Sequence, residues 1–148
     1  MNDSSKPARH IPQLADFPHR ITDNIRHTDL DSQGHVNNAV VANYFENGRV
    51  GLFRLDDASI GFPGVGVVLA HTEINYVREL NWPGTIEIGT AVAEIGRSSF
   101  KFAHAVFNNG ACAAHGSATI VLIDLATRRS TPLPDALTER LRPWMRNR

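Results

Sequence analysis

A short segment of the chain carries two carboxylates, one imidazole and two amides, side chains that can attack, polarise or hold a carbonyl group. They belong to Asp29, Asp31, His35, Asn37 and Asn38. An apolar pattern of helical period begins directly after them, so the segment stands at a helix N-terminus. Backbone N–H groups lack intrahelical partners there, and the helix dipole is positive. Such a place suits a site that binds a carbonyl oxygen and activates a nucleophile.

Asp31 is the candidate reactive group, because a carboxylate can attack a carbonyl carbon or take a proton from water. The sequence leaves these two routes open. His35 is a candidate oxyanion donor or orienter of the carboxylate, and a hydrogen-bonded interior histidine is the alternative. Asn37 is a candidate substrate-binding residue, although it and Asn38 also suit a helix cap. We interpret Asp29 as a structural residue that orients the loop.

Apolar side chains at helical spacing predict one long helix that ends near Leu55. The members of this pattern are Val40, Val41, Tyr44, Phe45, Gly48, Leu52 and Leu55. Gly48 and Gly51 each weaken an isolated helix by up to about 1 kcal/mol. Their presence therefore predicts that the helix packs closely against a sheet.

Alternating or apolar patterns predict five strands. They span His19 to His27, Val65 to Tyr76, Thr85 to Ile95, Ser98 to Phe107 and Ala111 to Asp124. Asn108-Asn109-Gly110 predicts a tight hairpin, because Asn and Gly accept positive φ. The last strand is rich in Ala, Gly and Ser, so a bulky element must lie on it, and the long helix is the candidate. A short helix is expected within residues 134–146.

The order strand, long helix and four antiparallel strands predicts an α+β fold in which a curved five-stranded antiparallel sheet wraps one central helix. Exposed sheet edges favour pairing between subunits, so we expect a homo-oligomer. A chain of 148 residues suits one domain. We expect residues 1–18 to form a flexible N-terminal tail and residues 19–148 to form the domain.

Composition argues against several classes of partner. The formal net charge is zero, so we expect no general attraction to nucleic acid or to an anionic membrane. No apolar run approaches the roughly 20 residues that span a bilayer, and we expect no secretory signal. The single cysteine, Cys112, excludes an intrachain disulfide and fits a reducing cytoplasm. We interpret its side chain as a buried packing residue.

Motifs for other chemistries do not fit. Asp29 to Gly34 imitates the start of a calcium-binding loop, but Val40 occupies the twelfth position, where a glutamate is needed. No His or Cys pair has zinc spacing, so we expect no metal. The sequence has no G-x-S-x-G elbow, P-loop or dinucleotide fingerprint, and we expect no cofactor.

Four stretches of the chain form a recognisable set. They are Asp29-Leu-Asp-Ser-Gln-Gly-His-Val-Asn-Asn38 with Tyr44-Phe45-Glu46 and Arg49 downstream, Ile74-Asn-Tyr76-Val-Arg-Glu79, Ile95-Gly-Arg-Ser-Ser99 and Pro132-Leu-Pro134. Together they resemble the hotdog-fold acyl-CoA thioesterases of the 4-hydroxybenzoyl-CoA thioesterase type, from about Arg20 to Pro134. The resemblance implies the hotdog fold and hydrolysis of an acyl-CoA to a free acid and CoA, with CoA as part of the substrate.

The resemblance also implies roles for single residues. The second aspartate of the family's D-x-D pair is the catalytic carboxylate and corresponds to Asp31. The chain is also similar to plant acyl-ACP thioesterases, whose D-x-N-x-H motif corresponds to Asp31, Gln33 and His35. Gln33 departs from the motif's asparagine, which puts its role in doubt. The catalytic glutamate of the plant enzymes corresponds to Glu79, for which pairing with a basic residue is the alternative.

The turn around Arg97 resembles the strand connection that contacts the CoA phosphates in the family. A guanidinium makes bidentate bonds to phosphate, and Ser98 and Ser99 add hydroxyl donors. A solvated hairpin turn is the alternative. The resemblance further implies a homodimer or homotetramer with the site between subunits.

Other functions compete with acyl-CoA hydrolysis. An acyl-ACP thioesterase is one, because Arg97 suits any carrier that bears phosphate. A non-catalytic acyl-thioester binding protein is another, which the carboxylate of Asp31 disfavours. A hotdog dehydratase or hydratase would carry a D-x-N-P-x-H motif with Asp and His five positions apart. Here Asp31 and His35 are four positions apart and the proline is missing, which argues against that interpretation.

Overall fold

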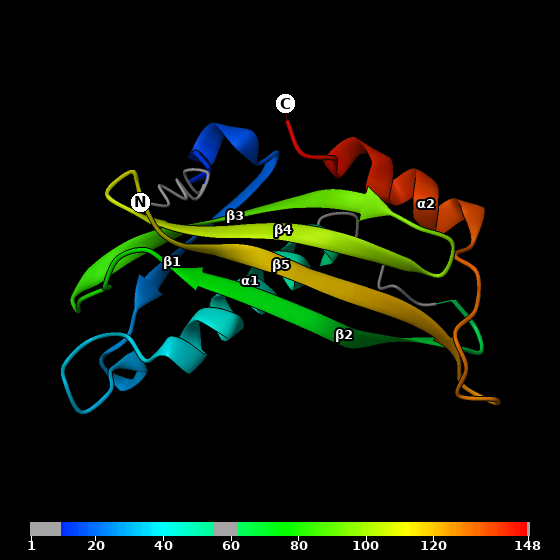
Figure 1. The fold of residues 1–148 in the computed structure, drawn as a ribbon, viewed down its shortest axis with the longest axis horizontal. Helices are drawn as coiled ribbons and strands as arrows, with labels where there is room; N and C mark the ends of the chain where they lie inside the picture. Colours follow the sequence, from blue (N-terminus) through cyan, green and yellow to red (C-terminus); the bar gives the residue numbers. More distant parts are fainter. Residues whose placement is uncertain (1–9, 55–61, 148) are drawn as a thin grey trace, which may run out of the picture.

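Figure 1 shows the protein as a computed structural model that describes residues 10–54 and 62–147. Its helices and strands are β1 His19–Ile25, α1 Asn38–Arg54, β2 Val65–Tyr76, β3 Gly84–Ile95, β4 Ser99–Asn108, β5 Ala111–Asp124 and α2 Asp135–Leu141. Short 3-10 turns lie at Leu14–Asp16, His27–Asp29 and Arg142–Trp144. All five strands and both helices predicted from the sequence are therefore confirmed. The predicted helix end, Leu55, lies outside the described residues.

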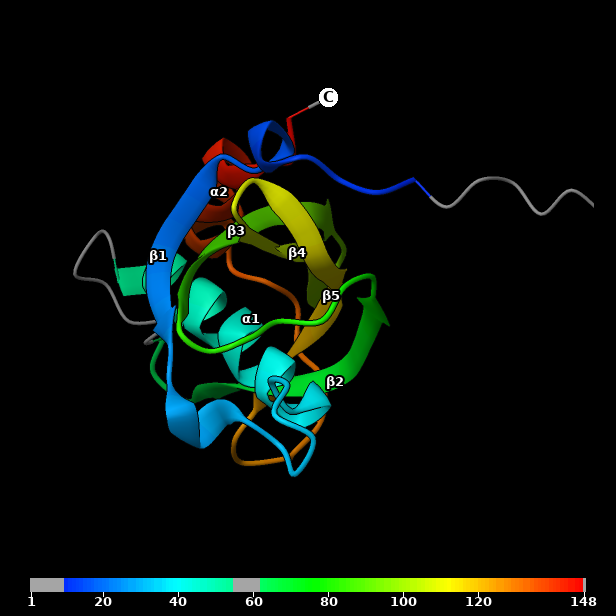
Figure 2. The same ribbon diagram turned by 90° about the vertical axis from the view of Figure 1, so that its left-hand side faces the viewer.

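The five strands form one antiparallel sheet in the order β1-β3-β4-β5-β2. β2 lies at the far edge beside β5, so the connection from β1 to β2, which contains α1, joins the two edges of the sheet. Figure 2 shows the sheet curving around this helix. The expected α+β arrangement, one central helix wrapped by a five-stranded sheet, is confirmed.

α1 packs on the sheet through one apolar face. Val41, Tyr44, Phe45, Gly48 and Leu52 recur at three- and four-residue intervals and are buried, as helical periodicity requires. A Cβ atom added at Gly48 would collide with the Thr90 Oγ1 of β3 and lie 3.0 Å from Ile88 Cγ2. The close helix-to-sheet packing expected from this glycine is confirmed.

The small residues of β5 have two explanations, one of which was not expected. The backbone of α1 lies closest to β1, β3 and β4, and not to β5. Ala113 and Ala114 do join the core around Tyr44 and Phe45. A side chain at Gly116, however, would run into the backbone of Glu73 in the neighbouring strand β2. Glycine fits this position because β2 and β5 approach each other closely there.

Packing in the domain includes residues before the expected boundary at residue 19. Phe17 is buried and its ring lies edge-on to Phe107 of β4 at a centroid distance of 6.0 Å. Gly89 allows this, because a Cβ there would meet the Phe17 ring. Packing of Phe17 therefore shortens the part of residues 1–18 that can act as a tail, and residues 1–9 lie outside the described residues.

β2 is an edge strand with apolar side chains left exposed. Val67, Val68 and Leu69 are 42%, 38% and 53% exposed. The register of the β2–β5 ladder shifts between Leu69 and His71, which marks a bulge.

In the part of the chain that the structure describes, neither helix has the length and apolar character to cross a bilayer.

Candidate active site

Asp29 anchors the loop that precedes α1. Its buried Oδ2 accepts hydrogen bonds from the Arg26 backbone N–H at 2.8 Å and from the Tyr44 hydroxyl at 2.9 Å. Its backbone carbonyl accepts from the Asn37 N–H at 2.8 Å. Burial, with the Asp29 carboxylate as a second cause, raises the pKa of Tyr44 well above its usual value. These contacts support the structural role expected for Asp29, which ties the loop to the helix on both sides of Asp31.

Asp31 is exposed and sits in a tight turn. Its Oδ1 accepts hydrogen bonds from the backbone N–H groups of Gln33 at 2.8 Å and His35 at 3.3 Å. The turn closes at Gly34, whose φ of +80° favours glycine. Among the described residues, no donor is assigned to Asp31 Oδ2. One carboxylate oxygen is thus held in place while the other remains free to react.

The first turn of α1 borders the same pocket as Asp31. The Asn37 side chain caps the helix, because its Oδ1 accepts from the Ala39 backbone N–H at 3.0 Å. The N–H of Asn38, the first helical residue, has no acceptor among the described residues. It lies at the positive end of the helix dipole, where it can donate to an oxyanion. The cap role of Asn37 keeps its amide oxygen on the helix and away from a substrate.

His35 connects this loop to the segment between β2 and β3. The Val36 backbone N–H donates to the Leu80 carbonyl at 2.9 Å and joins the two segments. His35 Nε2 then lies 3.4 Å from Glu79 Oε2, and His35 Nδ1 lies 3.0 Å from Asn81 Oδ1. The structure therefore brings together His35 and Glu79, two predicted site residues that are far apart in the sequence.

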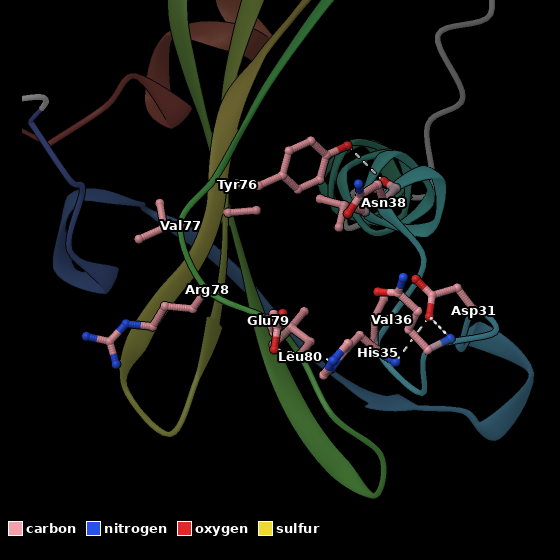
Figure 3. Close-up of a pocket in the computed structure, with 12 residues that line it drawn as sticks. Asp31, His35, Val36, Asn38, Tyr76, Val77, Arg78, Glu79 and Leu80 are labelled. Atoms are coloured by element: carbon pink, nitrogen blue, oxygen red, sulfur yellow. Dashed lines mark hydrogen bonds and ion pairs between the residues drawn. The ribbon is translucent and has the colours of Figure 1, made fainter.

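A pocket of about 330 Å³ opens between the two segments (Figure 3). Its polar lining consists of Asp31, Gln33, His35, Asn38, Arg78 and Glu79. Its apolar lining consists of Val36, Val41, Tyr76, Val77, Leu80 and Ala114. In Figure 3, Asp31 and His35 lie on one side of the pocket and the Tyr76 ring lies on the other. Its lining combines reactive polar groups with apolar side chains, which suits a substrate with a polar scissile group and an apolar tail.

Arg97, Ser98 and Ser99 lie at the opposite end of the sheet from this pocket (Figure 1). β3 separates them, since it begins just after Asn81 and ends just before Arg97. At about 3.3 Å per residue, a strand of this length spans on the order of 35 Å. Within one chain these residues do not meet Asp31. The Arg97 carbonyl instead accepts from the Leu133 N–H at 2.8 Å, which packs the closing Pro132-Leu-Pro134 stretch onto the turn.

Two residues of the site escaped the sequence analysis. Tyr76, whose hydroxyl donates to the Asn38 carbonyl at 2.9 Å, belongs to a recognised motif, and its place beside Glu79 was a usable signal. Asn81 stands in a short loop with no motif of its own, and only the fold reveals that it faces His35.

Other reactive side chains lie away from the pocket. Cys112 is buried, its Sγ lies 3.5 Å from the Ala114 carbonyl, and burial raises its thiol pKa. These facts agree with the packing role expected for it. Across residues 10–54 and 62–147, no three His, Cys, Asp or Glu side chains gather as a metal site would require.

Known proteins share the sequence pattern and the fold of this chain. The sequence model of the thioesterase-like superfamily matches residues 25–141. Among solved structures, a thioesterase from Thermus thermophilus complexed with coenzyme A and Zn shares 37% identity with a TM-score of 0.75, covering 87% of this chain and 95% of that one. Among curated proteins, none matches the sequence significantly.

Two more distant structures show the fold alone. A protein from Pseudomonas aeruginosa strain PAO1 has a TM-score of 0.81 at 24% identity, covering 92% of this chain and 97% of that one. A 1,4-dihydroxy-2-naphthoyl-CoA thioesterase from Synechocystis has a TM-score of 0.77 at 14% identity, covering 83% and 94%. The hotdog fold expected from the sequence motifs is confirmed.

Proposed function

Since this chain belongs to the thioesterase-like superfamily and is a thioester hydrolase, we propose that its substrate is an acyl-CoA, which it cleaves to a free acid and CoA with Asp31 as the reactive group. One observation carries the proposal. Asp31, whose Oδ2 has no donor among the described residues, and Asn38, whose N–H has no acceptor among them, line a single pocket. A nucleophile or base and an oxyanion donor are the two groups that thioester hydrolysis requires.

Two routes fit this arrangement. Asp31 Oδ2 can attack the thioester carbonyl carbon, which breaks the C–S bond, releases the CoA thiolate and leaves a mixed anhydride that water hydrolyses. Alternatively, Asp31 can take a proton from a water molecule that attacks the same carbon directly. In both routes the carbonyl oxygen gains negative charge, which the Asn38 N–H and the helix dipole stabilise.

We propose that His35 and Glu79 transfer the protons of this reaction. Both residues line the pocket, and their side chains lie 3.4 Å apart. A proton shared between them can pass to the leaving thiolate and be recovered from water. The contact with His35 also fits the alternative expected for Glu79, which is pairing with a basic residue. Glu79 lines the pocket as well.

A panel of acyl-CoA substrates with a thiol-detecting reagent tests the proposal. We expect turnover by the wild type and a loss of about 10²- to 10⁴-fold in kcat for Asp31→Asn, which preserves the shape of the side chain. Rapid quenching followed by intact mass analysis separates the routes. An acylated chain that is absent in Asp31→Asn supports the nucleophile. Hydrolysis of acyl-ACP but not of acyl-CoA would reassign the carrier, and tight acyl-CoA binding without turnover would favour a binding protein.

We further propose that the protein works as a homodimer with Arg97, Ser98 and Ser99 of a second copy near each pocket. Within one chain, the length of β3 keeps these residues from Asp31. The exposed edge of β2, with its apolar Val67 and Leu69, offers a surface for such pairing. The Arg97 guanidinium would then contact a phosphate of the carrier.

Complementation between two inactive variants tests the dimer. Asp31→Asn and Arg97→Ala each damage one half of a shared site, so mixing and refolding them together should restore activity in mixed dimers. Two Asp31→Asn chains refolded together provide the control. Mixed dimers that stay as inactive as their parents, or a monomer by light scattering at micromolar concentration, would contradict this arrangement.

A further inference from the structure

Tyr76 ends β2 with its side chain on the face of the sheet that packs against α1. Its partner across the β2–β5 ladder is Ala114, which is buried in the core beside Val41. Ile74, two residues earlier and therefore on the same face, packs against that same core. The tyrosine ring accordingly reaches from the sheet toward the helix, as Figure 3 shows.

The ring is held across this space at both ends. At the strand it is fixed by the ladder, and at the helix its hydroxyl donates to the Asn38 carbonyl oxygen at 2.9 Å. The side chain is nevertheless 52% exposed. A large aromatic ring that is this exposed gains little from burial. Its position is therefore better explained by what it borders than by core packing.

What it borders is the pocket, on the side across from Asp31. Val41 and Ala114 line the pocket together with Tyr76, and in Figure 3 the Tyr76 ring lies across the pocket from Asp31. An acyl chain whose carbonyl carbon sits near Asp31 would extend away from the polar groups and meet the tyrosine ring. The pocket volume of about 330 Å³ is at the small end of ligand pockets, which run from roughly 300 to 1,000 Å³.

We propose that Tyr76 is the wall that limits the acyl group, and that the substrate class is short-chain acyl-CoA. This inference rests on the proposed function, whose pocket and reacting residue it shares. Tyr76 is a specificity-determining residue here, since its ring touches the acyl tail and takes no part in breaking the C–S bond.

Affinity for non-hydrolysable S-alkyl-CoA thioethers, measured by calorimetry on the full chain, tests the proposal without requiring turnover. In the wild type, affinity should rise by about fourfold for each buried methylene from S-ethyl- to S-butyl-CoA. It should then fall for S-dodecyl-CoA by at least tenfold relative to S-butyl-CoA. Tyr76→Ala and the bulkier Tyr76→Val should remove that tenfold preference, whereas Tyr76→Phe keeps the ring and should keep the wild-type profile.

Leu125→Ala is the matched control. Leu125 is 48% exposed and lies at the opposite end of the β2–β5 ladder, outside the pocket lining. It should leave the chain-length profile unchanged. A wild type that binds S-dodecyl-CoA as tightly as S-butyl-CoA, a profile that Tyr76→Ala and Tyr76→Val do not alter, or no binding of any thioether would overturn the inference. Because binding is the readout, an inactive protein with the expected profile would refute only the proposed hydrolysis.

Discussion

His35 and Asn81 are separated by 46 positions in the sequence, yet the Nδ1 atom of His35 lies 3.0 Å from the Oδ1 atom of Asn81. An amide oxygen only accepts hydrogen bonds, so Nδ1 carries the proton in this contact. The contact of Nε2 with Glu79 Oε2 at 3.4 Å then needs a second proton, carried by the ring or by the Glu79 carboxyl group, which is the proton that the proposed mechanism shares. Asn81 thereby selects the tautomer and the orientation of His35, and so acts as a positioning residue.

Removing Asn81 should disturb His35 without emptying the pocket. We expect Asn81→Ala to lower kcat about tenfold, because a ring that loses its orienting partner transfers protons less efficiently. Asn81→Asp, which retains an acceptor, should keep most of the activity. Nitrogen NMR of the His35 ring supplies the readout that a purely structural role would not move. Equal tautomer signals in the wild type and Asn81→Ala would refute the assignment.

Loss of the buried hydroxyl at Tyr44 should weaken both the fold and the catalytic loop. Tyr44→Phe removes one of the two donors to Asp29 Oδ2, and a hydrogen bond to a charged group contributes about 1.5–3 kcal/mol. Urea denaturation measures this loss of unfolding free energy. Tyr76→Phe makes the same chemical change at an exposed hydroxyl, so it should cost clearly less. Equal losses in the two variants would contradict the role given to Asp29.

The two glycines of α1 should respond in opposite directions to alanine. Gly48→Ala places a Cβ onto Thr90 Oγ1, and overpacking of this kind costs about 1–3 kcal/mol. At Gly51 the nearest atom to an added Cβ is His19 Cε1 at 3.4 Å, an ordinary contact. Gly51→Ala should therefore be neutral or stabilise the fold by up to about 1 kcal/mol through helix propensity. Thermal unfolding of both variants decides the matter, and stabilisation by Gly48→Ala would disprove the close packing.

Stability should decline in mild acid because of a buried histidine. His104 is 1% exposed, and burial, with smaller contributions from Arg49 and His19, lowers its pKa well below the ordinary value of 6.5. Its ring stacks on Phe45 and meets Thr90 Oγ1 at 3.3 Å, while Nε2 has no partner among the described residues. The folded protein thus keeps this ring neutral at a pH where the unfolded chain takes up a proton.

The sign of the effect follows from that difference. Above about pH 6.5 neither state binds the extra proton, and the contribution of His104 is constant. Below it the unfolded state is favoured by up to about 1.4 kcal/mol per pH unit. Urea denaturation between pH 5 and 8 should show this slope reduced in His104→Gln, which does not titrate. His71→Gln changes an exposed ring and should keep the slope, and an equal slope in all three proteins would contradict the prediction.

Local patterns in the sequence predicted the elements well, because alternation and turn chemistry act over a few residues. The bounds of β2 and β5 agree with the predictions, and the Asn108-Asn109-Gly110 turn is a hairpin with positive φ at Asn109 and Gly110. The site was only partly accessible from the sequence. Asp31 and the helix start are neighbours in the chain, whereas Asn81 reaches His35 through the sheet.

Placement in the sheet could not be predicted from the sequence for the same reason. No short sequence pattern predicts that β2 lies at the far edge of the sheet, or that Arg97 lies far from Asp31. Both follow from which strands pair. The motif around Arg97 is similar to a family feature, but a resemblance carries no information on which end of the molecule, or which copy, presents it.

The sheet order also has a consequence for the sequence of events in folding. β3, β4 and β5 are joined by short turns and are neighbours in the sheet, so their pairing closes only small loops. β1 and β2 must be added at opposite edges across longer stretches of chain, and closing longer loops costs more entropy and is slower. The loop with Asp31 and His35, which lines one side of the pocket, follows β1. The segment with Glu79 and Leu80, which lines the other side, follows β2. We therefore expect β3, β4 and β5 to pair before the pocket forms. The loop that carries Asp31 should then be among the last regions to become protected from hydrogen exchange.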